Sequence, residues 1–225
     1  MPAKSVVRVP HGTGDIEAAT LPMNGLTARM ALDFLELPTG STIAVIGAAG
    51  AVGGYTVQLA KADGLRVIAD AAPKDEQLVK DLGADLVLSR GDAFPDLVRK
   101  EIPDGVDGLV DTAGVAVDGT RAVREGGRVA TSAGASQETA ERGISIHQTF
   151  VPEYAHDHAN LERLHRLVEE GRVTLRVART LPAEQARDAH RLGEAGHRGE
   201  REQDDGGGTP VDGGTFRRHR YLRQR

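Results

Sequence analysis

Short apolar runs alternate along most of the chain with segments in which apolar residues recur at helical spacing. The predicted strands cover residues 43–46, 65–69, 86–88, 106–110, 128–131 and 144–150. The predicted helices follow Gly53 and Pro73 and also cover residues 94–100, 117–125 and 158–170. Apolar runs of this kind are typical of strands that are buried on both faces of a parallel sheet. The pattern therefore predicts an α/β fold, a doubly wound parallel sheet of about six strands with helices on both faces.

Three glycines mark the first change from strand to helix, in the stretch TIAVIGAAGAVGGYTVQLAKA from Thr42 to Ala62. Gly47, Gly50 and Gly53 stand at every third position. Glycine permits a tight turn and leaves no Cβ in the path of a phosphate, which the free amides at a helix start attract. The spacing Gly-x-x-Gly-x-x-Gly is not the commoner Gly-x-Gly-x-x-Gly. A tight turn without a ligand is therefore an alternative to a diphosphate site.

Composition narrows the class of protein. The chain has 225 residues, 39% hydrophobic and 27% charged, as expected for one soluble globular domain. The net charge of −5 offers no general electrostatic reason to bind nucleic acid. The absence of cysteine excludes disulfides, thiolate zinc sites and a thiol nucleophile, and fits a reducing cytoplasm. No apolar run approaches the roughly 20 residues that span a bilayer, so we expect a cytoplasmic protein without a membrane partner.

Polar and glycine residues follow the predicted strands at their carboxyl ends. Ligands of open α/β sheets bind beyond these ends. The segments concerned are residues 47–53, 70–74, 111–114 and 132–134. The binding site is therefore expected at this edge of the sheet.

Six segments in a fixed order carry a resemblance to a known family. They read LPMNGLTARMAL, VIGAAGAVGGYTVQLAKADGLRVIA, KDLGAD, VDGLVDTAG, GGRVATSAG and LVEEGRVTLRVARTLPAEQARDAHRL. From about Val7 to Gly199 the chain resembles the cofactor half of the medium-chain dehydrogenase/reductase superfamily, in its zinc-independent quinone oxidoreductase-like branch. The resemblance implies a Rossmann-like NAD(P)-binding domain. It also implies hydride transfer from the nicotinamide to a small-molecule electron acceptor, a quinone or an enone.

The resemblance assigns cofactor-binding roles residue by residue. The phosphate loop would consist of Gly47, Ala49, Gly50, Ala51, Val52 and Gly53. The nicotinamide end would be lined by Thr27, Thr112, Ala113, Ser132 and Ala133. Ordinary capping or turn chemistry is the alternative for the hydroxyl residues of the second group.

The end of the second predicted strand bears on the choice of cofactor. An acid there favours NAD through the ribose hydroxyls, whereas a nearby cation favours the extra phosphate of NADP. Asp70 lies one residue before the expected acidic position, and Lys74 matches a position that is often basic in the NADP-using branch. We therefore expect NADPH rather than NADH. A solvated lysine at a helix start is the alternative for Lys74.

No metal site and no catalytic side chain are expected. Without cysteine, the zinc sites of the zinc-dependent relatives cannot be built in their usual form. His156 and His158 lie just before a helix with no matching third ligand in the sequence. Neither Tyr55 nor Tyr154 has a lysine four residues on, so the short-chain dehydrogenase pair is missing. In the quinone-reductase branch the protein mainly orients cofactor and acceptor.

Both ends of the sequence depart from the family pattern. Residues 1–22 are interpreted as the linker to a missing GroES-like domain, residues 23–199 as the NAD(P)-binding domain, and residues 200–225 as a disordered polar tail. We hypothesise a shifted reading frame near Gly199 and a truncated or misassigned start. The tail ends in a basic stretch with Arg217, Arg218, Arg220, Arg223 and Arg225. A solvated tail is the favoured interpretation, and contact with RNA or anionic lipid is the alternative.

Two questions stay open from the sequence. A catalytically impaired nucleotide-binding remnant is the alternative to an active oxidoreductase, because half of the family's substrate cleft would be absent. A homodimer is expected through the cofactor domain, with Ile144–Phe150 or Val173–Val177 as the edge that pairs.

Overall fold

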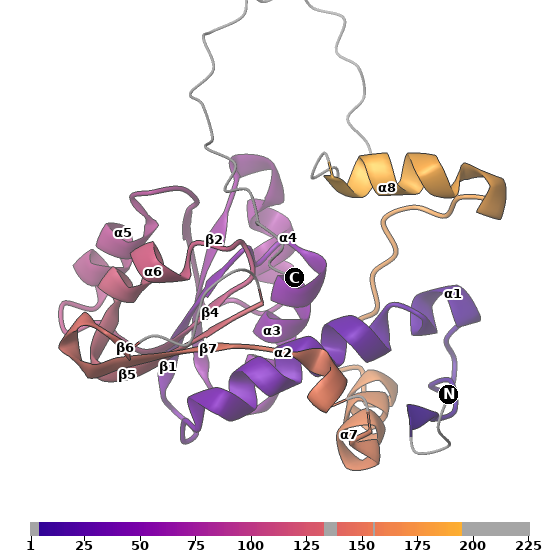
Figure 1. The fold of residues 1–225 in the computed structure, drawn as a ribbon, viewed down its shortest axis with the longest axis horizontal. Coiled ribbons are helices and arrows are strands. Elements are labelled where there is room, and N and C mark those ends of the chain that lie inside the picture. Colours follow the sequence, from indigo (N-terminus) through magenta and orange to yellow (C-terminus); the bar gives the residue numbers. More distant parts are fainter. Residues whose placement is uncertain (1–4, 133–138, 155, 195–225) are drawn as a thin grey trace, which may run out of the picture. The chain divides into compact units, whose positions relative to one another are not determined.

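The computed structural model describes residues 5–132, 139–154 and 156–194. The chain divides into two units, Met1–Thr180 and Leu181–Arg225. The described part of the second unit is a short 3-10 turn, Ala183–Gln185, followed by helix α8, Ala186–Glu194. The first unit contains the sheet and the other labelled helices (Figure 1).

The sheet of the first unit has six parallel strands and one short antiparallel strand. Its order is β3-β2-β1-β4-β5-β7-β6, with β6 alone running antiparallel to its neighbour β7. The strands are β1 (Thr42–Ile46), β2 (Arg66–Ala71), β3 (Leu86–Ser89), β4 (Val106–Asp111), β5 (Val123–Thr131), β6 (Thr139–Ala140) and β7 (Ile144–Gln148). The order reverses between β1 and β4, which makes their carboxyl ends the switch point where ligands of such sheets bind.

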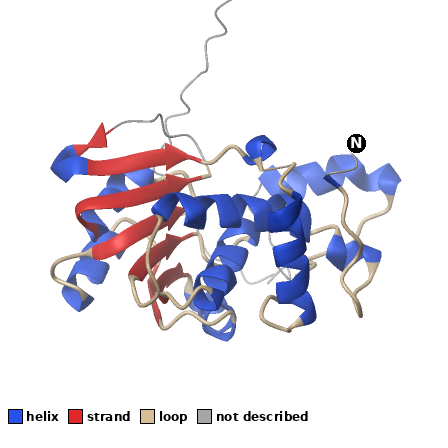
Figure 2. Ribbon diagram, turned by 90° about the horizontal axis from the view of Figure 1, so that it is seen from below, coloured by secondary structure: helices blue, strands red, loops and turns tan. Residues whose placement is uncertain are grey.

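Helices cover both faces of the sheet, as Figure 2 shows. One hydrophobic cluster packs one face of the sheet against four helices: α2 (Leu21–Leu35), α3 (Ala51–Ala62), α4 (Glu76–Asp81) and α7 (His158–Glu169). A second cluster joins the opposite face to α5 (Phe94–Glu101) and α6 (Ala116–Gly119). The short helix α1 (Asp15–Ala18) precedes α2. The prediction of a Rossmann-like, doubly wound parallel sheet is confirmed.

The stretch predicted as a helix over 117–125 is mostly something else. Helix α6 ends at Gly119, a 3-10 turn covers Thr120–Ala122, and β5 begins at Val123. Gly126 and Gly127 do not stop a helix. They lie in a bulge of β5, because Val106 pairs with Val123 whereas Gly108 pairs with Arg128. Gly126 has a φ of +66°, which favours glycine.

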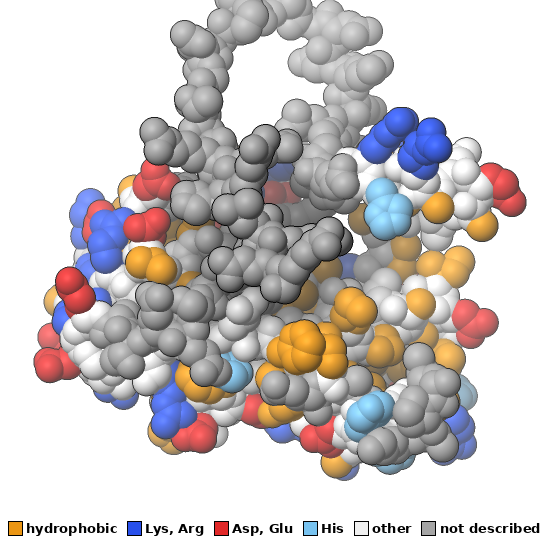
Figure 3. All heavy atoms as spheres, in the orientation of Figure 1, with side chains coloured by type: hydrophobic (Ala, Val, Ile, Leu, Met, Phe, Trp, Pro, Cys, Tyr) orange, Lys and Arg blue, Asp and Glu red, His pale blue; other side chains and the backbone are white. Residues whose placement is uncertain are grey.

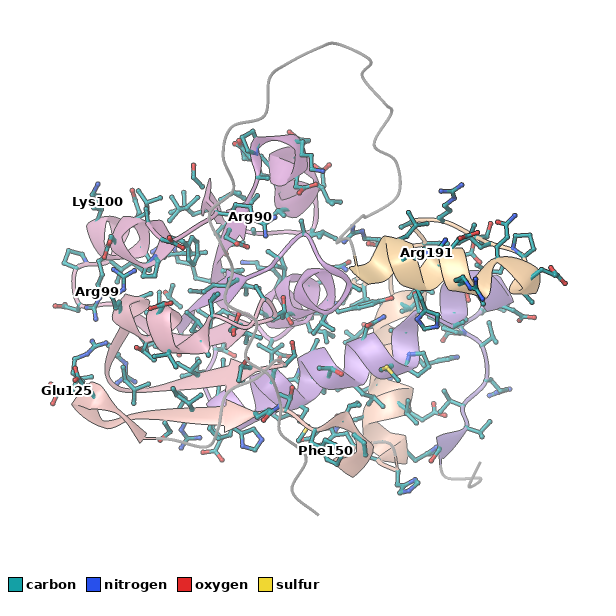
Figure 4. The ribbon with its side chains drawn as sticks, turned by 45° about the horizontal axis from the view of Figure 1, so that its top comes forward. Arg90, Arg99, Lys100, Glu125, Phe150 and Arg191 are labelled. Atoms are coloured by element: carbon teal, nitrogen blue, oxygen red, sulfur yellow. The ribbon has the colours of Figure 1, made fainter. Side chains whose placement is uncertain are left out.

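Two predicted edge segments also differ from the sequence expectation. Strand β7 ends at Gln148, and Phe150 beyond it is 61% exposed (Figure 4). Residues 173–177 form no strand, and the buried Val173 packs into the first cluster. Within the described residues, no helix has both the length and the apolarity needed to cross a membrane.

Candidate functional site

The glycine turn between β1 and α3 lies at the switch point, and two of its glycines are required by contacts. Gly47 has a φ of +79°, and a Cβ there would lie 2.4 Å from Thr112 Oγ1. A Cβ on Gly53 would lie 2.2 Å from the carbonyl oxygen of Gly47. The first turn of α3 therefore packs directly against the end of β1. This is the close helix–strand approach that glycine permits in nucleotide-binding turns.

Asp70 faces the glycine turn. Its Oδ1 accepts hydrogen bonds from the amides of Gly47 at 2.7 Å and Ala48 at 3.1 Å, and the residue is 4% exposed. The carboxylate thus fixes two amides at the start of the turn. These hydrogen bonds give Asp70 a role in holding the turn, beside the ribose contact expected from the sequence.

Asp111, the last residue of β4, and Thr112, which follows it, make hydrogen bonds that fix the backbone at the carboxyl ends of β1 and β4. Thr112 Oγ1 donates to the carbonyl oxygens of Ile46 at 2.9 Å and Gly47 at 3.3 Å. Asp111 is fully buried, and its Oδ1 accepts from the amides of Ala113 and Gly114 at 2.9 and 3.1 Å. A second buried carboxylate therefore shapes the turn after β4 as Asp70 shapes the turn after β1.

The hydrogen bonds within the glycine turn leave three backbone amides without an acceptor among the described residues. The amide of Gly50 donates to Gly47 at 2.8 Å, and the amide of Gly54 donates to Gly50 at 2.9 Å. The amides of Ala51, Val52 and Gly53 make no backbone hydrogen bond to a described residue, as expected for the first turn of a helix. These three amides, at the positive end of the α3 dipole, can hold an anion.

An arginine that lies far away in the sequence also reaches the turn. Arg176 Nη2 lies 3.4 Å from the carbonyl oxygen of Ala49, and Nη1 lies beside Gly54. Its positive charge is close enough to affect Tyr55 on α3. Burial raises the pKa of the Tyr55 hydroxyl, while the hydrogen bond with Thr20 and the charge of Arg176 oppose this shift.

The remaining predicted residues lie in different settings. Thr27 lies in α2, 9% exposed, and its hydroxyl donates to the carbonyl oxygen of Met23 at 2.7 Å. Lys74 is exposed in the 3-10 turn Pro73–Asp75 that follows β2. Ser132 follows β5, and its amide donates to Asp111 at 3.0 Å. Ala133 lies outside the described residues. Of the residues predicted for the nicotinamide end, Thr112 thus contacts the end of β1 and the glycine turn.

The described residues do not fit a zinc ion. Among residues 5–132, 139–154 and 156–194, no group of three or more His, Asp or Glu side chains could hold a metal ion, and the sequence has no cysteine. His156 instead lies 2.7 Å, through Nδ1, from the Ser5 hydroxyl, and His158 is 3.5 Å from Glu162.

A parallel sheet with helices on both faces and a glycine turn at its switch point defines a Rossmann-type α/β domain. A family model described as zinc-binding dehydrogenase matches residues 82–199, more than half of the chain. The chain therefore belongs to the zinc-binding dehydrogenase family, within the medium-chain dehydrogenase/reductase superfamily. The resemblance inferred from the ordered segments is confirmed at this level.

Relatives agree with this assignment. A 2-methylene-furan-3-one reductase from Solanum lycopersicum is 35% identical over 135 residues, which cover 59% of this chain and 34% of the relative. A chloroplastic NADPH-dependent alkenal/one oxidoreductase from Arabidopsis thaliana is 33% identical over 121 residues, 53% of this chain and 30% of the relative. The matched parts are about a third of these curated relatives. A structure of an alcohol dehydrogenase superfamily protein from Novosphingobium aromaticivorans superposes with a TM-score of 0.77 and 26% identity, covering 87% of this chain and 63% of that one.

Sequence reasoning named Asp70 but not its hydrogen bonds to the glycine turn, and it missed Arg176. The inward direction of Asp70 depends on the twist of β2 beside β1, which no local pattern reports. Arg176 lies 127 positions from Ala49. Its segment has no regular secondary structure, and only its packing along α3 brings it to the turn.

Proposed function

We propose that the chain binds a nicotinamide dinucleotide and belongs to an NADPH-dependent oxidoreductase that reduces a small quinone or enone. The observation that supports this most strongly is the glycine turn. Asp70 and Thr112 hold its backbone while the amides of Ala51, Val52 and Gly53 stay open at the switch point of the sheet. Such amides bind the diphosphate of dinucleotides in folds of this type.

The described residues fit the cofactor. The diphosphate would lie on the three open amides, with Gly50 leaving room beside them. Thr112 and Ala113 would form one wall, Ser132 the next, and Thr27 would lie near the nicotinamide. When bound, NADPH would supply a hydride. The chain's own residues bind and orient the cofactor, and we infer no side chain that moves a proton and no role for zinc.

Two observations support the proposed preference for NADPH, and one of them also supports the proposed acceptor. Lys74 offers a cation near the end of β2, where Asp70 is turned toward the glycine turn. The names of the two plant relatives, a 2-methylene-furan-3-one reductase and an NADPH-dependent alkenal/one oxidoreductase, support NADPH and an unsaturated carbonyl compound.

A second candidate is a nucleotide-binding protein that turns nothing over. The aligned segments cover only 34% and 30% of the two relatives, so the match by itself does not carry over the activity of those whole proteins. Hydride transfer needs a shaped cleft from which water is excluded, whereas dinucleotide binding needs only the glycine turn. Binding with no turnover is the expected behaviour of this candidate.

We also propose the setting in which the protein works. The acceptor is a small molecule, the location is the cytoplasm, and neither nucleic acid nor membrane is a partner. Figure 3 supports the last point for the face it shows, where anionic and cationic side chains stand side by side over α5 and β5. A homodimer would form through the β7 side of the sheet.

A titration followed by an activity assay tests the proposal. NADPH is titrated by fluorescence, and NADH is the comparison. Gly50→Val should abolish binding, because the branched side chain would occupy the space of the diphosphate. Oxidation of NADPH is then followed with a panel of quinones and enones. Unchanged affinity in the Gly50→Val variant would show that the dinucleotide does not bind at this turn, and binding without oxidation would select the second candidate.

A further inference from the structure

Arg90 follows the last residue of β3 and lies directly beside the end of β2. Ala71, the last residue of β2, pairs in parallel register with Ser89, and the amide of Arg90 donates to the carbonyl oxygen of Ala71 at 3.0 Å. The backbone of Arg90 is therefore fixed at the carboxyl edge of the sheet, although the residue is exposed (Figure 4). In open α/β sheets that bind dinucleotides, the adenosine ribose lies beyond the end of the second strand.

A second residue with a cationic side chain lies near the same strand end. Lys74 is exposed in the 3-10 turn Pro73–Asp75, which begins two residues after β2 ends. The turn is closed by a hydrogen bond from the amide of Asp75 to the carbonyl oxygen of Ala72, at 2.8 Å. Lys74 is thus held near the end of β2, as Arg90 is. Two cationic residues from different segments of the chain therefore lie close to one strand end.

Neither of these cations is engaged with another side chain. Within the part of the chain that the structure describes, the side chains of Lys74 and Arg90 form no ion pair and no hydrogen bond. By contrast, Lys80 in the following helix pairs with Glu76 at 2.6 Å. Two unpaired positive charges near one strand end raise the local electrostatic potential, which favours an anion there.

Resting on the dinucleotide binding proposed above, we propose that Arg90, together with Lys74, binds the 2′-phosphate on the adenosine ribose of NADPH and so selects NADPH over NADH. A planar guanidinium can donate two parallel hydrogen bonds to phosphate oxygens, which a lysine ammonium cannot do in the same geometry. NADH carries a neutral hydroxyl at this position, which gains far less from a cation. Arg90 belongs to a different strand from the one that Lys74 follows, so only the pairing of β2 with β3 brings the two cations together.

Equilibrium titrations of the full chain test the role of Arg90, at low ionic strength because salt screens exposed charges. NADPH and NADH are titrated by fluorescence. Adenosine 2′,5′-bisphosphate and adenosine 5′-monophosphate, which differ in the 2′-phosphate alone, are then used as competitors. Arg90→Gln should weaken NADPH and the bisphosphate about tenfold, the scale of one lost hydrogen bond between charged groups, and leave NADH and the monophosphate unchanged. Arg90→Lys should recover part of the affinity, since it restores the charge without the planar fork.

Arg66→Gln is the matched control. Arg66 is also exposed, but it begins β2 at the opposite edge of the sheet, roughly 16 Å along the strand from Ala71. Its replacement should leave the ratio of NADPH to NADH affinity unchanged. Lys74→Gln should lower that ratio several-fold, as expected for a second and less directional phosphate contact. Because Arg90 is exposed and unpaired, Arg90→Gln should keep the thermal unfolding midpoint of the unaltered chain.

The outcomes separate this inference from the function on which it depends. Failure of the unaltered chain to bind either dinucleotide would refute the proposed function itself. If the dinucleotides bind, the role of Arg90 is overturned when the unaltered chain binds NADPH no more tightly than NADH. It is also overturned when the NADPH affinity of Arg90→Gln lies within twofold of the Arg66→Gln control. An equal loss for NADPH and NADH would count against it too, because a merely structural role would weaken both.

Discussion

At the scale of single residues, Asp70 is the clearest case of a side chain whose role follows from its direction. Asp70→Ala would leave the buried amides of Gly47 and Ala48 without their acceptor. We expect a loss of about 2–3 kcal/mol in the free energy of unfolding, measured by urea denaturation. Asp70→Asn keeps an oxygen at the same place and should cost less than about 1 kcal/mol. Equal losses in the two variants would show that the charge, and not the hydrogen bonds, stabilises the turn.

At the scale of elements, one carboxylate links three helices. Asp63, the residue after α3, pairs with Arg29 of α2 and Arg163 of α7, each at 2.6 Å. Arg29 is only 4% exposed, so the loss of Asp63 would leave its buried charge with Asp33 as the remaining ion-pair partner. The Oδ1 atom of Asp33 lies 2.8 Å from Arg29 Nε, but the two atoms are not aligned for a hydrogen bond.

Asp63 and its partly exposed partner Arg163 should differ in their contributions to stability. Asp63→Asn should lower the free energy of unfolding by about 2–4 kcal/mol, as for a buried ion pair broken on one side. Arg163→Gln should cost less than about 1 kcal/mol, because the Arg163 side chain is 43% exposed and its pair is screened by water. Urea denaturation measures both. A larger cost for Arg163→Gln would contradict the proposed dependence on burial.

A second link between elements is sensitive to pH. Asp85 accepts hydrogen bonds from Lys61 of α3 and from the amide of Val67 in β2. Burial tends to raise the pKa of Asp85, but these hydrogen bonds and the charges of Lys61 and Arg66 outweigh it, so its pKa lies below the usual value. A depressed carboxyl pKa contributes stability above the unfolded pKa, near 4, and loses it as the pH falls through the folded pKa.

Asp85→Asn should remove the contribution of this carboxylate to the pH dependence of stability. At pH 7, Asp85→Asn should be less stable than the unaltered chain by at most about 1 kcal/mol, since the pair is partly exposed. The difference should shrink as the pH falls below about 4. Thermal unfolding at a series of pH values measures it. A gap that stays constant down to the acid range would show that the Asp85 pKa is not lowered by folding.

At the scale of the whole molecule, ligand binding should stabilise the unit that carries the sheet. A ligand present at a hundred times its dissociation constant adds about 2.7 kcal/mol to the free energy of unfolding if only the folded state binds it. NADPH should therefore raise the thermal midpoint, and NADH at the same concentration should raise it less. The absence of any shift at millimolar NADPH would count against dinucleotide binding. Gly50→Val serves as the control that cannot bind.

Sequence reasoning worked best where a local rule has a physical cause. The strands and the glycine turn were predictable because buried parallel strands are apolar and because Gly47 needs a positive φ. The same reasoning failed at Gly126-Gly127, where two glycines in a strand bulge resemble a helix stop. It also failed over residues 173–177, where apolar alternation reflects packing along α3 and not a strand.

The sequence by itself determined the class of fold, the position of the glycine turn and the family, since these depend on periodicity, on glycine stereochemistry and on the order of motifs along the chain. Only the tertiary structure decided which way Asp70 points and that Arg176 reaches Ala49. A strand's side-chain direction depends on its neighbours, and a contact across 127 positions depends on packing that no local pattern encodes. The electrostatics of this site are therefore a property of the folded chain.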